Sequence, residues 1–440
     1  MAILFVILNF QIMDQEEILI LGAGISGLVA GRILLRAGMS VTIIEARERV
    51  GGRILTIHRD GQVLEAGPEF IHGDLKETIS LLKEFGIEYV EVEGKMYFAR
   101  DSHFVEEKEY VEDWEQLMEK MRSLKTDLPF LQFLQENFGG ESYRGLRKSA
   151  IGYAEGYDLA DVSRVSTLSL IREWKIEEDG PQYRIPKGYS QLTDALAGEF
   201  IYYGGKILLN QQANHILWAP GSAMVTTMDN RKFAAKKLVV TLPLGVLTYK
   251  QDNVYTIQFS PDIMLKRKAM EQIGFGTVMK IVLQWKIPFW KLFVPDAQFI
   301  FSGKGIPTWW TQDPVNSNLL TGWVGGPGAE DFSRLPEEDL IATALESLSA
   351  VFGIEEKELK GKLLEVNIFN WKNEIFTRGA YSYSYPGSEQ ARATLKSPVE
   401  GTIYFAGEAY YDGPHGGEVE AAIISGMETA RQIIRHAESG

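Results

Sequence analysis

Three glycines and one acidic residue near the start of the chain have the spacing of a dinucleotide-binding fingerprint. Gly22 permits a tight turn, Gly24 lets the backbone approach a pyrophosphate, and Gly27 lets a helix pack close to a strand. Glu45 can accept hydrogen bonds from the hydroxyls of a ribose. These residues predict a nucleotide cofactor, but their spacing does not by itself distinguish NAD from FAD.

The elements that must position these residues are also indicated by the sequence. Apolar β-forming residues predict a strand at 18–21 and another at 40–44, and amphipathic periodicity predicts a helix at about 26–37 between them. The N-terminus of that helix would offer N–H groups and a partial positive charge to phosphates. The arginines and glycines at 47–53 favour a longer cofactor such as FAD, with a solvated basic loop as the alternative.

Composition limits the classes of protein and partner. The chain has 440 residues, 45% of them hydrophobic, and a net charge of −14, which is typical of a soluble globular protein of about two domains. Binding to the phosphates of a nucleic acid requires clustered Lys and Arg, and this chain is acidic, so we expect no nucleic-acid partner. The absence of cysteine excludes disulfides, thiolate catalysis and a Cys-linked cofactor. The six histidines lack metal-binding spacing, so we expect no metal site.

The first 13 residues are apolar but too short to span a bilayer. They lack a basic region and a small-residue cleavage site, so they make a poor signal peptide. We expect residues 1–13 to be an N-terminal extension outside the core, with Met13 as a candidate start. No other segment is long enough for a membrane span, and we expect a cytoplasmic protein.

Nucleotide-binding elements occur at both ends of the chain and in its middle. We therefore expect an α/β fold in which a Rossmann-like FAD-binding domain (14–75, 187–255 and 396–440) is interleaved with an α+β substrate domain (76–186 and 256–395). A loop rich in Gly, Pro and Trp is expected at about 303–328. Other helices are expected at 74–90, 109–137, 192–203, 262–272, 336–352, 355–361 and 418–436, and other strands at 206–209, 213–218, 223–228, 237–241, 277–286, 363–371 and 402–406.

Six sequence blocks, in order along the chain, resemble the flavin amine oxidases. This family includes monoamine oxidases, polyamine and spermine oxidases, and flavin-type histone lysine demethylases, and the motifs are most similar to those of polyamine oxidases. The blocks are GAGISGLVAG with EARERVGGR (22–53), LEAGPEFIHG (64–73), VVTLPLGVL (239–247), IGFGTVMKIVLQWKIPFW (273–290), NWKNEIFTRGAYSYSYPG (370–387) and IYFAGEAYYDGPHGGEVEAAIISG (403–426).

The resemblance implies the amine oxidase fold and a set of FAD contacts. Ala380 stands where monoamine oxidases attach FAD through Cys, so it also implies that the flavin is held without a covalent bond. The implied contacts reach the pyrophosphate, the adenosine, the ribityl chain and the flavin ring. They are Gly22, Gly24, Ser26, Gly27, Glu45, Ala46, Arg47, Gly52, Arg53, Ala213, Glu408 and Val419.

Four further residues are implied to face the flavin or the substrate. Lys280 matches the lysine that holds a water beside flavin N5, and this water would be the partner of its ammonium; a solvent-facing lysine is the alternative. Tyr381 matches one wall of an aromatic cage, and Glu418 replaces the second tyrosine of that cage. His72 matches a histidine near the substrate amine. The alternatives are a core tyrosine, a helix-start glutamate and a structural histidine.

The implied activity is FAD-dependent oxidation of an amine, with a polyamine as a candidate substrate, to an imine that hydrolyses to a carbonyl and an amine while O2 becomes H2O2. An L-amino-acid oxidase is one alternative, although no Arg is seen near the block at 64–73. A desaturase-like or porphyrinogen-oxidase-like enzyme is a second, disfavoured by RGAYSY and Lys280. A non-catalytic flavoprotein binding module is a third. The sequence indicates neither the exact amine nor the oligomeric state.

Overall fold

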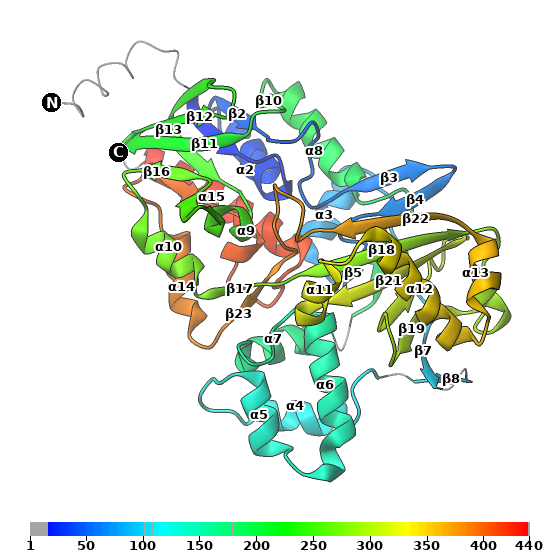
Figure 1. Ribbon diagram of the computed structural model, residues 1–440. Coiled ribbons are helices and arrows are strands. Elements are labelled where there is room, and N and C mark those ends of the chain that lie inside the picture. Colours follow the sequence, from blue (N-terminus) through cyan, green and yellow to red (C-terminus); the bar gives the residue numbers. More distant parts are fainter. Residues whose placement is uncertain (1–15, 101–102, 108, 178–179, 439–440) are drawn as a thin grey trace.

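Two large sheets lie side by side in the computed structural model, and a group of helices extends from one end of the molecule (Figure 1). The structure describes residues 16–100, 103–107, 109–177 and 180–438. The predicted extension at 1–13 lies outside this range. Within the described residues, no helix has the length and apolar content that crossing a membrane requires.

The first sheet has eight strands with a parallel centre. β1 pairs in parallel with β2 and β13, and β13 pairs in parallel with β24, so the carboxyl ends of these four strands meet at one edge. The strand order is β10 (Lys206–Leu208), β2 (Val41–Ile44), β1 (Glu16–Leu21), β13 (Lys232–Val240), β12 (Ser222–Thr227), β11 (Ala213–Ala219) and β16 (Gln258–Ser260), with β24 (Ile403–Phe405) also beside β13.

Alternate residues of β1 pack on opposite faces of this sheet, as the period of a strand requires. Ile18 and Ile20 contact the core formed by α2 (Ile25–Arg36), α8 (Ser190–Tyr202) and α15 (Val419–Glu438). Leu19 and Leu21 contact the core on the other face. The opposite core includes residues of α9 (Leu244–Thr248), α10 (Met264–Met270), α14 (Ser388–Lys396) and η3 (Glu408–Tyr410).

The second sheet has seven strands around β18, whose eight residues are all buried. Its order is β22 (Leu363–Asn370), β18 (Val278–Trp285), β21 (Leu319–Gly325), β20 (Thr308–Trp310), β19 (Ala297–Ser302), β7 (Lys95–Arg100) and β8 (His103–Glu106). The core beside it includes residues of α11 (Gly326–Phe332), α12 (Glu337–Phe352), α13 (Glu356–Lys362) and η2 (Phe289–Leu292).

The predicted loop at 303–328 is wrong, because this segment supplies β20, β21 and the start of α11. Its glycines serve packing within a strand: a Cβ on Gly322 would come within 2.8 Å of the Trp309 ring, so glycine is needed for the ring to lie against β21. The local sequence signal resembled that of a turn, but the apolar residues of β21 pair with β18.

Four helices form the group at the lower end of Figure 1. The predicted single helix at 109–137 is wrong, because residues 123–129 are not helical and separate two helices. Pro129 directly precedes the second helix and forms a β-bridge with Ser166. The helices are α4 (Trp114–Arg122), α5 (Phe130–Asn137), α6 (Arg144–Gly156) and α7 (Thr167–Glu177), with the short η1 (Glu141–Tyr143) before α6.

Small strand pairs connect the larger parts. β17, which lies just before β18, pairs antiparallel with β23, which directly follows Tyr381. The domain boundaries given above stay a prediction. The remaining elements are β3 (Thr56–Arg59), β4 (Gln62–Glu65), β5 (Phe70–His72), α3 (Lys76–Glu84), β6 (Val90–Glu91), β9 (Gln182–Arg184), β14 (Lys250–Gln251), β15 (Val254–Tyr255), β17 (Ile273–Phe275) and β23 (Ser382–Ser384).

Candidate active site

A cavity of about 1280 Å³ begins at the carboxyl edge of the first sheet and reaches the second sheet. Its size exceeds the roughly 300–1000 Å³ of most small-ligand pockets, so it has room for a dinucleotide and a further molecule. The predicted residues that line it are Gly22, Gly24, Ser26, Glu45, Ala46, Arg47, Gly52, Arg53, His72, Ala213, Lys280, Tyr381, Glu408, Glu418 and Val419.

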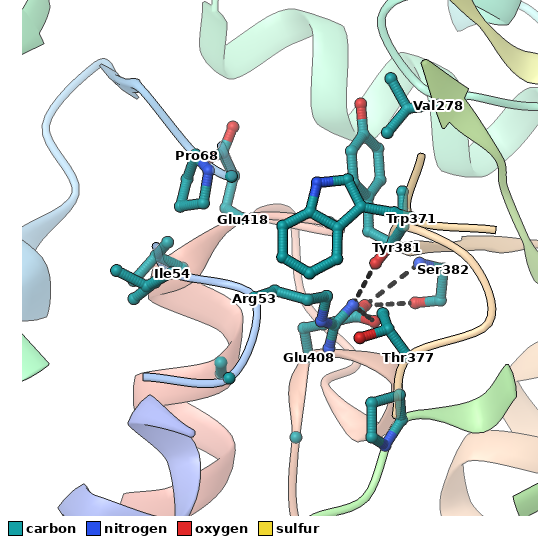
Figure 2. Close-up of a pocket in the computed structure, with 18 of the residues that line it drawn as sticks. Arg53, Ile54, Pro68, Val278, Trp371, Thr377, Tyr381, Ser382, Glu408 and Glu418 are labelled. Atoms are coloured by element: carbon teal, nitrogen blue, oxygen red, sulfur yellow. Dashed lines mark hydrogen bonds and ion pairs between the residues drawn. The ribbon is translucent and has the colours of Figure 1, made fainter. Parts of the chain in front are cut away.

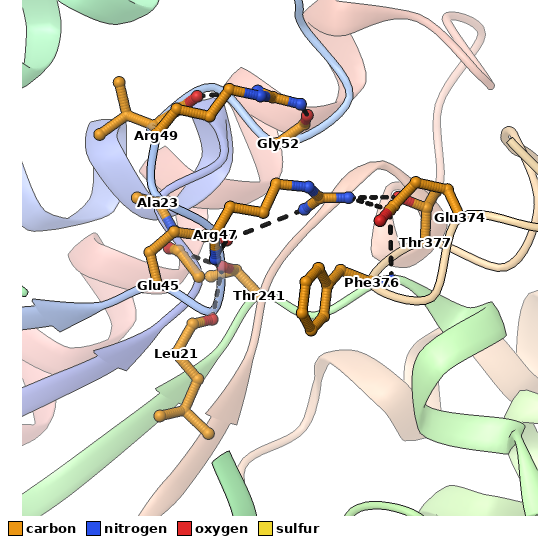
Figure 3. A network of polar contacts seen from close by, with 12 residues as sticks. Leu21, Ala23, Glu45, Arg47, Arg49, Gly52, Thr241, Glu374, Phe376 and Thr377 are labelled. Atoms are coloured by element: carbon orange, nitrogen blue, oxygen red, sulfur yellow. Dashed lines mark hydrogen bonds and ion pairs between the residues drawn. The ribbon is translucent and has the colours of Figure 1, made fainter. Parts of the chain in front are cut away.

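Gly27 is the predicted site residue that does not line the cavity. A Cβ at this position would lie 2.2 Å from the carbonyl oxygen of Gly22, so only glycine lets α2 pack against the turn. Gly22 itself has a φ of +106°, and the Thr241 hydroxyl donates to the Leu21 carbonyl at 2.7 Å beside it (Figure 3). The turn is therefore fixed by close packing and by hydrogen bonds from Thr241, directly after β13, to the carbonyl groups of Leu21 and Gly22.

The turn leaves open space and unused polar groups on its cavity side. A Cβ on Gly24 would meet no protein atom within 4 Å, and no side chain caps the N-terminus of α2. The Ser26 hydroxyl is buried without a hydrogen-bond partner among the described residues. N–H groups of a helix start, a nearby hydroxyl and open space fit the pyrophosphate of FAD.

Glu45 holds the end of β2 against this turn. One carboxylate oxygen accepts the Ala23 N–H at 2.8 Å and the other accepts the Arg47 N–H at 2.9 Å (Figure 3). Each oxygen has a second lone pair, so the carboxylate can still accept from a ribose hydroxyl. Ala213 lies at the start of β11 on the same side of the cavity.

Arg47 connects this part of the site to the loop between β22 and β23. Its guanidinium donates to Glu374 and, at 2.8 Å, to the Thr377 hydroxyl, and it lies 5.3 Å from the centre of the Phe376 ring (Figure 3). Sequence reasoning missed Glu374 and Thr377, because no local pattern relates them to the glycine turn.

Arg53 and Glu408 form a second link across the cavity. The guanidinium lies 2.9 Å from one Glu408 oxygen and donates to the Ala380 carbonyl, while the Ser382 hydroxyl donates to the other Glu408 oxygen at 2.7 Å (Figure 2). Glu408 is buried, so its charge requires these partners. These contacts hold the segment that carries Tyr381 against the loop that contains Arg53.

Lys280 is buried at the centre of β18, which excludes the solvent-facing alternative. Its ammonium lies 2.6 Å from the Glu69 carboxylate and 3.3 Å from the Gly67 carbonyl, so a protein carboxylate is its partner where we expected a water. Burial would raise the pKa of Glu69, but the charges of Lys280 and Arg184 outweigh burial and hold that pKa below its ordinary value.

The fold also brings an arginine to the block at 64–73, where the sequence showed none. Arg184 lies 3.3 Å from Glu69 and 4.8 Å from the centre of the Phe70 ring. Its guanidinium donates to the Thr311 carbonyl at 3.1 Å, and Arg184 is not among the residues that line the cavity. This arginine therefore supports Glu69 from behind the cavity wall.

Tyr157, which sequence reasoning missed, connects the three residues predicted to face the substrate. Its hydroxyl donates to Glu418 at 3.3 Å, its carbonyl accepts from the Tyr381 hydroxyl, and its ring lies edge-on to His72 with 5.3 Å between ring centres. Figure 2 shows Glu418 and Tyr381 on either side of the Trp371 ring in the view. Desolvation lowers the pKa of His72 to about 4, so its imidazole is neutral at neutral pH.

Both cations and carboxylates line the cavity. Among the described residues, four cations line the cavity, and each contacts a protein group: Arg47 contacts Glu374, Arg53 contacts Glu408, Lys280 contacts Glu69, and Arg378 lies 3.4 Å from the centre of the Tyr249 ring. Carboxylates also line the part of the cavity next to the helical group. They are Glu109, Glu115, Asp158, Glu173 and Glu418.

A model of the family described as "Flavin containing amine oxidoreductase" matches residues 25–126 and 88–434, which together span most of the chain. The chain belongs to the flavin-containing amine oxidoreductase family. This membership confirms the predicted family and the predicted cofactor, FAD, and the residues around the glycine turn fit that cofactor.

Known members show the same similarity over nearly the whole chain. Mouse lysine-specific histone demethylase 1B is 26% identical over 95% of this chain and 53% of its own length, so the chain spans about half of that relative. Polyamine oxidase 4 of Oryza sativa subsp. japonica is 24% identical over 96% of this chain and 89% of its own length. A structure of putrescine oxidase bound to putrescine is 23% identical in sequence, and the match covers 96% of this chain and 99% of that chain. Its TM-score of 0.80 confirms the predicted fold class.

Proposed function

We propose that this family member is an FAD-dependent amine oxidase whose substrate carries at least two amino groups, a polyamine. The observation that supports this proposal is the group of acidic residues, Glu109, Glu115, Asp158 and Glu418, that line the cavity near the helical group, whereas the lining cations of the described residues contact protein groups. Carboxylates in a partly dry cavity attract ammonium groups strongly.

Bound FAD would supply an acceptor for the hydride equivalent lost from the carbon beside nitrogen, with O2 taking the electrons on to H2O2. The resulting imine adds water and separates into a carbonyl and an amine. The chain's own residues would hold this substrate and exclude water. We assign the cofactor contacts to the lining residues of the glycine turn and to Arg53, Glu408 and Val419, without a covalent bond at Ala380.

The residues beside Tyr157 would bind one substrate nitrogen in its neutral form and another as an ammonium. The reacting nitrogen must be neutral, and a neutral His72 adds no positive charge there and can accept a hydrogen bond from it. Glu418 would hold a second nitrogen as an ammonium, and the Tyr381 ring would contact the substrate from its own side. A substrate with two or more nitrogens can satisfy both conditions.

An L-amino-acid oxidase is the second candidate, and it requires a cation for the substrate carboxylate. In the part of the chain that the structure describes, the four lining cations contact protein groups, and Arg184 contacts Glu69 behind the wall. Those contacts favour an amine substrate over an amino acid. The cytoplasmic location stays a prediction.

Initial rates of O2 consumption and H2O2 formation test the proposed function. The panel is spermine, spermidine, N-acetylated polyamines, benzylamine, tyramine and L-amino acids at matched concentrations. We expect the highest kcat/KM with a polyamine and one H2O2 for each amine oxidised. Higher kcat/KM with benzylamine or tyramine would reject the polyamine preference, and turnover of L-amino acids alone would support the second candidate.

A further inference from the structure

The ion pair between Lys280 and Glu69 is the feature that the proposed function leaves unexplained. Lys280 lies in the middle of β18 and Glu69 lies in the segment before β5, and both side chains are at most 3% exposed. Both residues also line the cavity. The pair is therefore buried from solvent but adjacent to the space that a flavin and a substrate would share.

The geometry limits what the lysine can do with its donors. A lysine ammonium has three N–H donors, and here one is directed to the Glu69 carboxylate at 2.6 Å and a second to the Gly67 carbonyl at 3.3 Å. One donor remains, and the Trp310 ring, which also lines the cavity, has its centre 5.3 Å from the ammonium nitrogen. The direction of this donor is set by the two anchored donors, because the three N–H bonds have fixed angles to one another.

Glu69 is itself held in place by groups behind the cavity wall. Its second oxygen accepts from the Gln312 side-chain amide at 2.8 Å and lies 3.3 Å from the Arg184 guanidinium. Arg184 is fixed in turn by the Phe70 ring and the Thr311 carbonyl. Contacts from two separate segments, at Arg184 and at Gln312, thus fix the carboxylate independently of Lys280.

We propose that Glu69 is a positioning residue of the flavin site, which anchors the Lys280 ammonium so that its remaining N–H points into the cavity. This inference rests on the proposed function, since it requires Lys280 to act beside the flavin. An isolated lysine on a strand could rotate about four bonds, and its ammonium would have no fixed direction. Glu69 removes that freedom and neutralises the buried charge at the same time.

A double-mutant cycle in the FAD-loaded protein tests this proposal. The variants are Lys280→Met, Glu69→Gln and the two combined, and stopped-flow absorbance measures flavin reduction by the amine and flavin reoxidation by O2. We expect both single variants to slow the same half-reaction, by about tenfold or more, and the double variant to be no slower than Lys280→Met. The visible spectrum of the bound flavin should shift in the same way in all three.

Glu199→Gln is the matched control, because Glu199 forms a partly buried ion pair with Arg32 between α2 and α8, away from Lys280. We expect it to lower the melting temperature without changing the flavin spectrum or either half-reaction. If Glu69→Gln does not yield folded protein, Glu69→Asp and the double variant, which removes both charges, carry the test.

Two results would overturn the proposal. If the effects of Glu69→Gln and Lys280→Met multiply in the double variant, Glu69 acts independently of Lys280. If Glu69→Gln changes only the melting temperature, as the control does, the ion pair is structural alone. The proposed function is tested separately by the amine panel with the unmodified protein, so a failed cycle with a successful panel rejects only this inference.

Discussion

Glu45, on the cavity wall that carries the glycine turn, and Lys280, on the wall formed by β18, obtain their polar partners from different distances along the chain. On the first wall, Glu45 accepts from backbone groups 22 and 2 residues away. On the second, Glu69 and Lys280 are 211 residues apart, and Tyr157 and Glu418 are 261 apart.

This difference has a consequence for what a substitution should disturb. The first wall is largely backbone, so its function depends on the space that each residue leaves for the cofactor. The second wall is built from charged and aromatic side chains, so its function depends on charge and direction. We therefore expect changes on the first wall to affect FAD retention, and changes on the second to affect substrate choice and pH dependence.

The largest expected effect is on the first wall, with Gly27→Ala. Its Cβ would lie 2.2 Å from the Gly22 carbonyl oxygen, which forces α2 away from the turn and should destabilise the FAD-free protein by about 1–3 kcal/mol or more. Gly24→Ala is the matched variant, because its Cβ meets no protein atom within 4 Å. It should leave thermal unfolding of the FAD-free protein unchanged but weaken FAD binding, measured by flavin fluorescence. Equal melting temperatures for both variants would contradict this prediction.

The second expected effect concerns His72 and pH. Its pKa falls to about 4 in the folded protein from about 6.5 when unfolded, so the unfolded state binds the extra proton and folding stability is lost as pH falls from about 6.5 towards 4. The loss at the acid end is at most about 3 kcal/mol, because His72 is only partly buried and lines the cavity. Urea unfolding of the FAD-free protein should show a shallower pH dependence in His72→Asn. The same slope in both proteins would mean that His72 is solvated.

The third expected effect concerns the negative charge of Glu418 on the second wall. Glu418→Gln removes the carboxylate proposed to hold a distal ammonium, and a charge-assisted hydrogen bond of this type is worth about 1.5–3 kcal/mol. We expect KM to rise about tenfold or more for a polyamine and to change little for benzylamine. Steady-state rates with both substrates measure this, and an equal rise for both would assign Glu418 to the fold or the flavin.

The smallest expected effect is on the long-range contact of the first wall. Glu374→Gln weakens the link from Arg47 to the loop after β22, and a partly exposed ion pair is worth about 0.2–1 kcal/mol. We expect FAD to dissociate up to about fivefold faster, measured by flavin fluorescence after dilution. Glu365→Gln, which breaks a surface ion pair with Arg59, is the control. An unchanged dissociation rate would mean that the loop does not retain the cofactor.

The sequence allowed the first wall to be predicted almost completely, because its strand, turn and helix are consecutive. Lys280 and Tyr381 were found through a family resemblance, and the structure brings both to the cavity. Glu69 as the partner of Lys280 and Tyr157 as the link to Glu418 were missed, since each contact joins segments far apart in sequence. The prediction of a loop at 303–328 was wrong for a related reason. Gly322 is typical of a turn in the local sequence, but in the fold the Trp309 ring packs against it.

The pairing of the first sheet has a consequence for the synthesis of the protein. Leu21 in β1 lies beside Val240 in β13, and Val240 lies beside Phe405 in β24. The ribosome must therefore complete more than half of the chain before β1 gains its central neighbour, and nearly all of it before β24 and α15 can join. Contacts between such distant residues form slowly. The site should capture its flavin only after β24 and α15 have left the ribosome, and a nascent chain that ends before residue 403 should emerge without it.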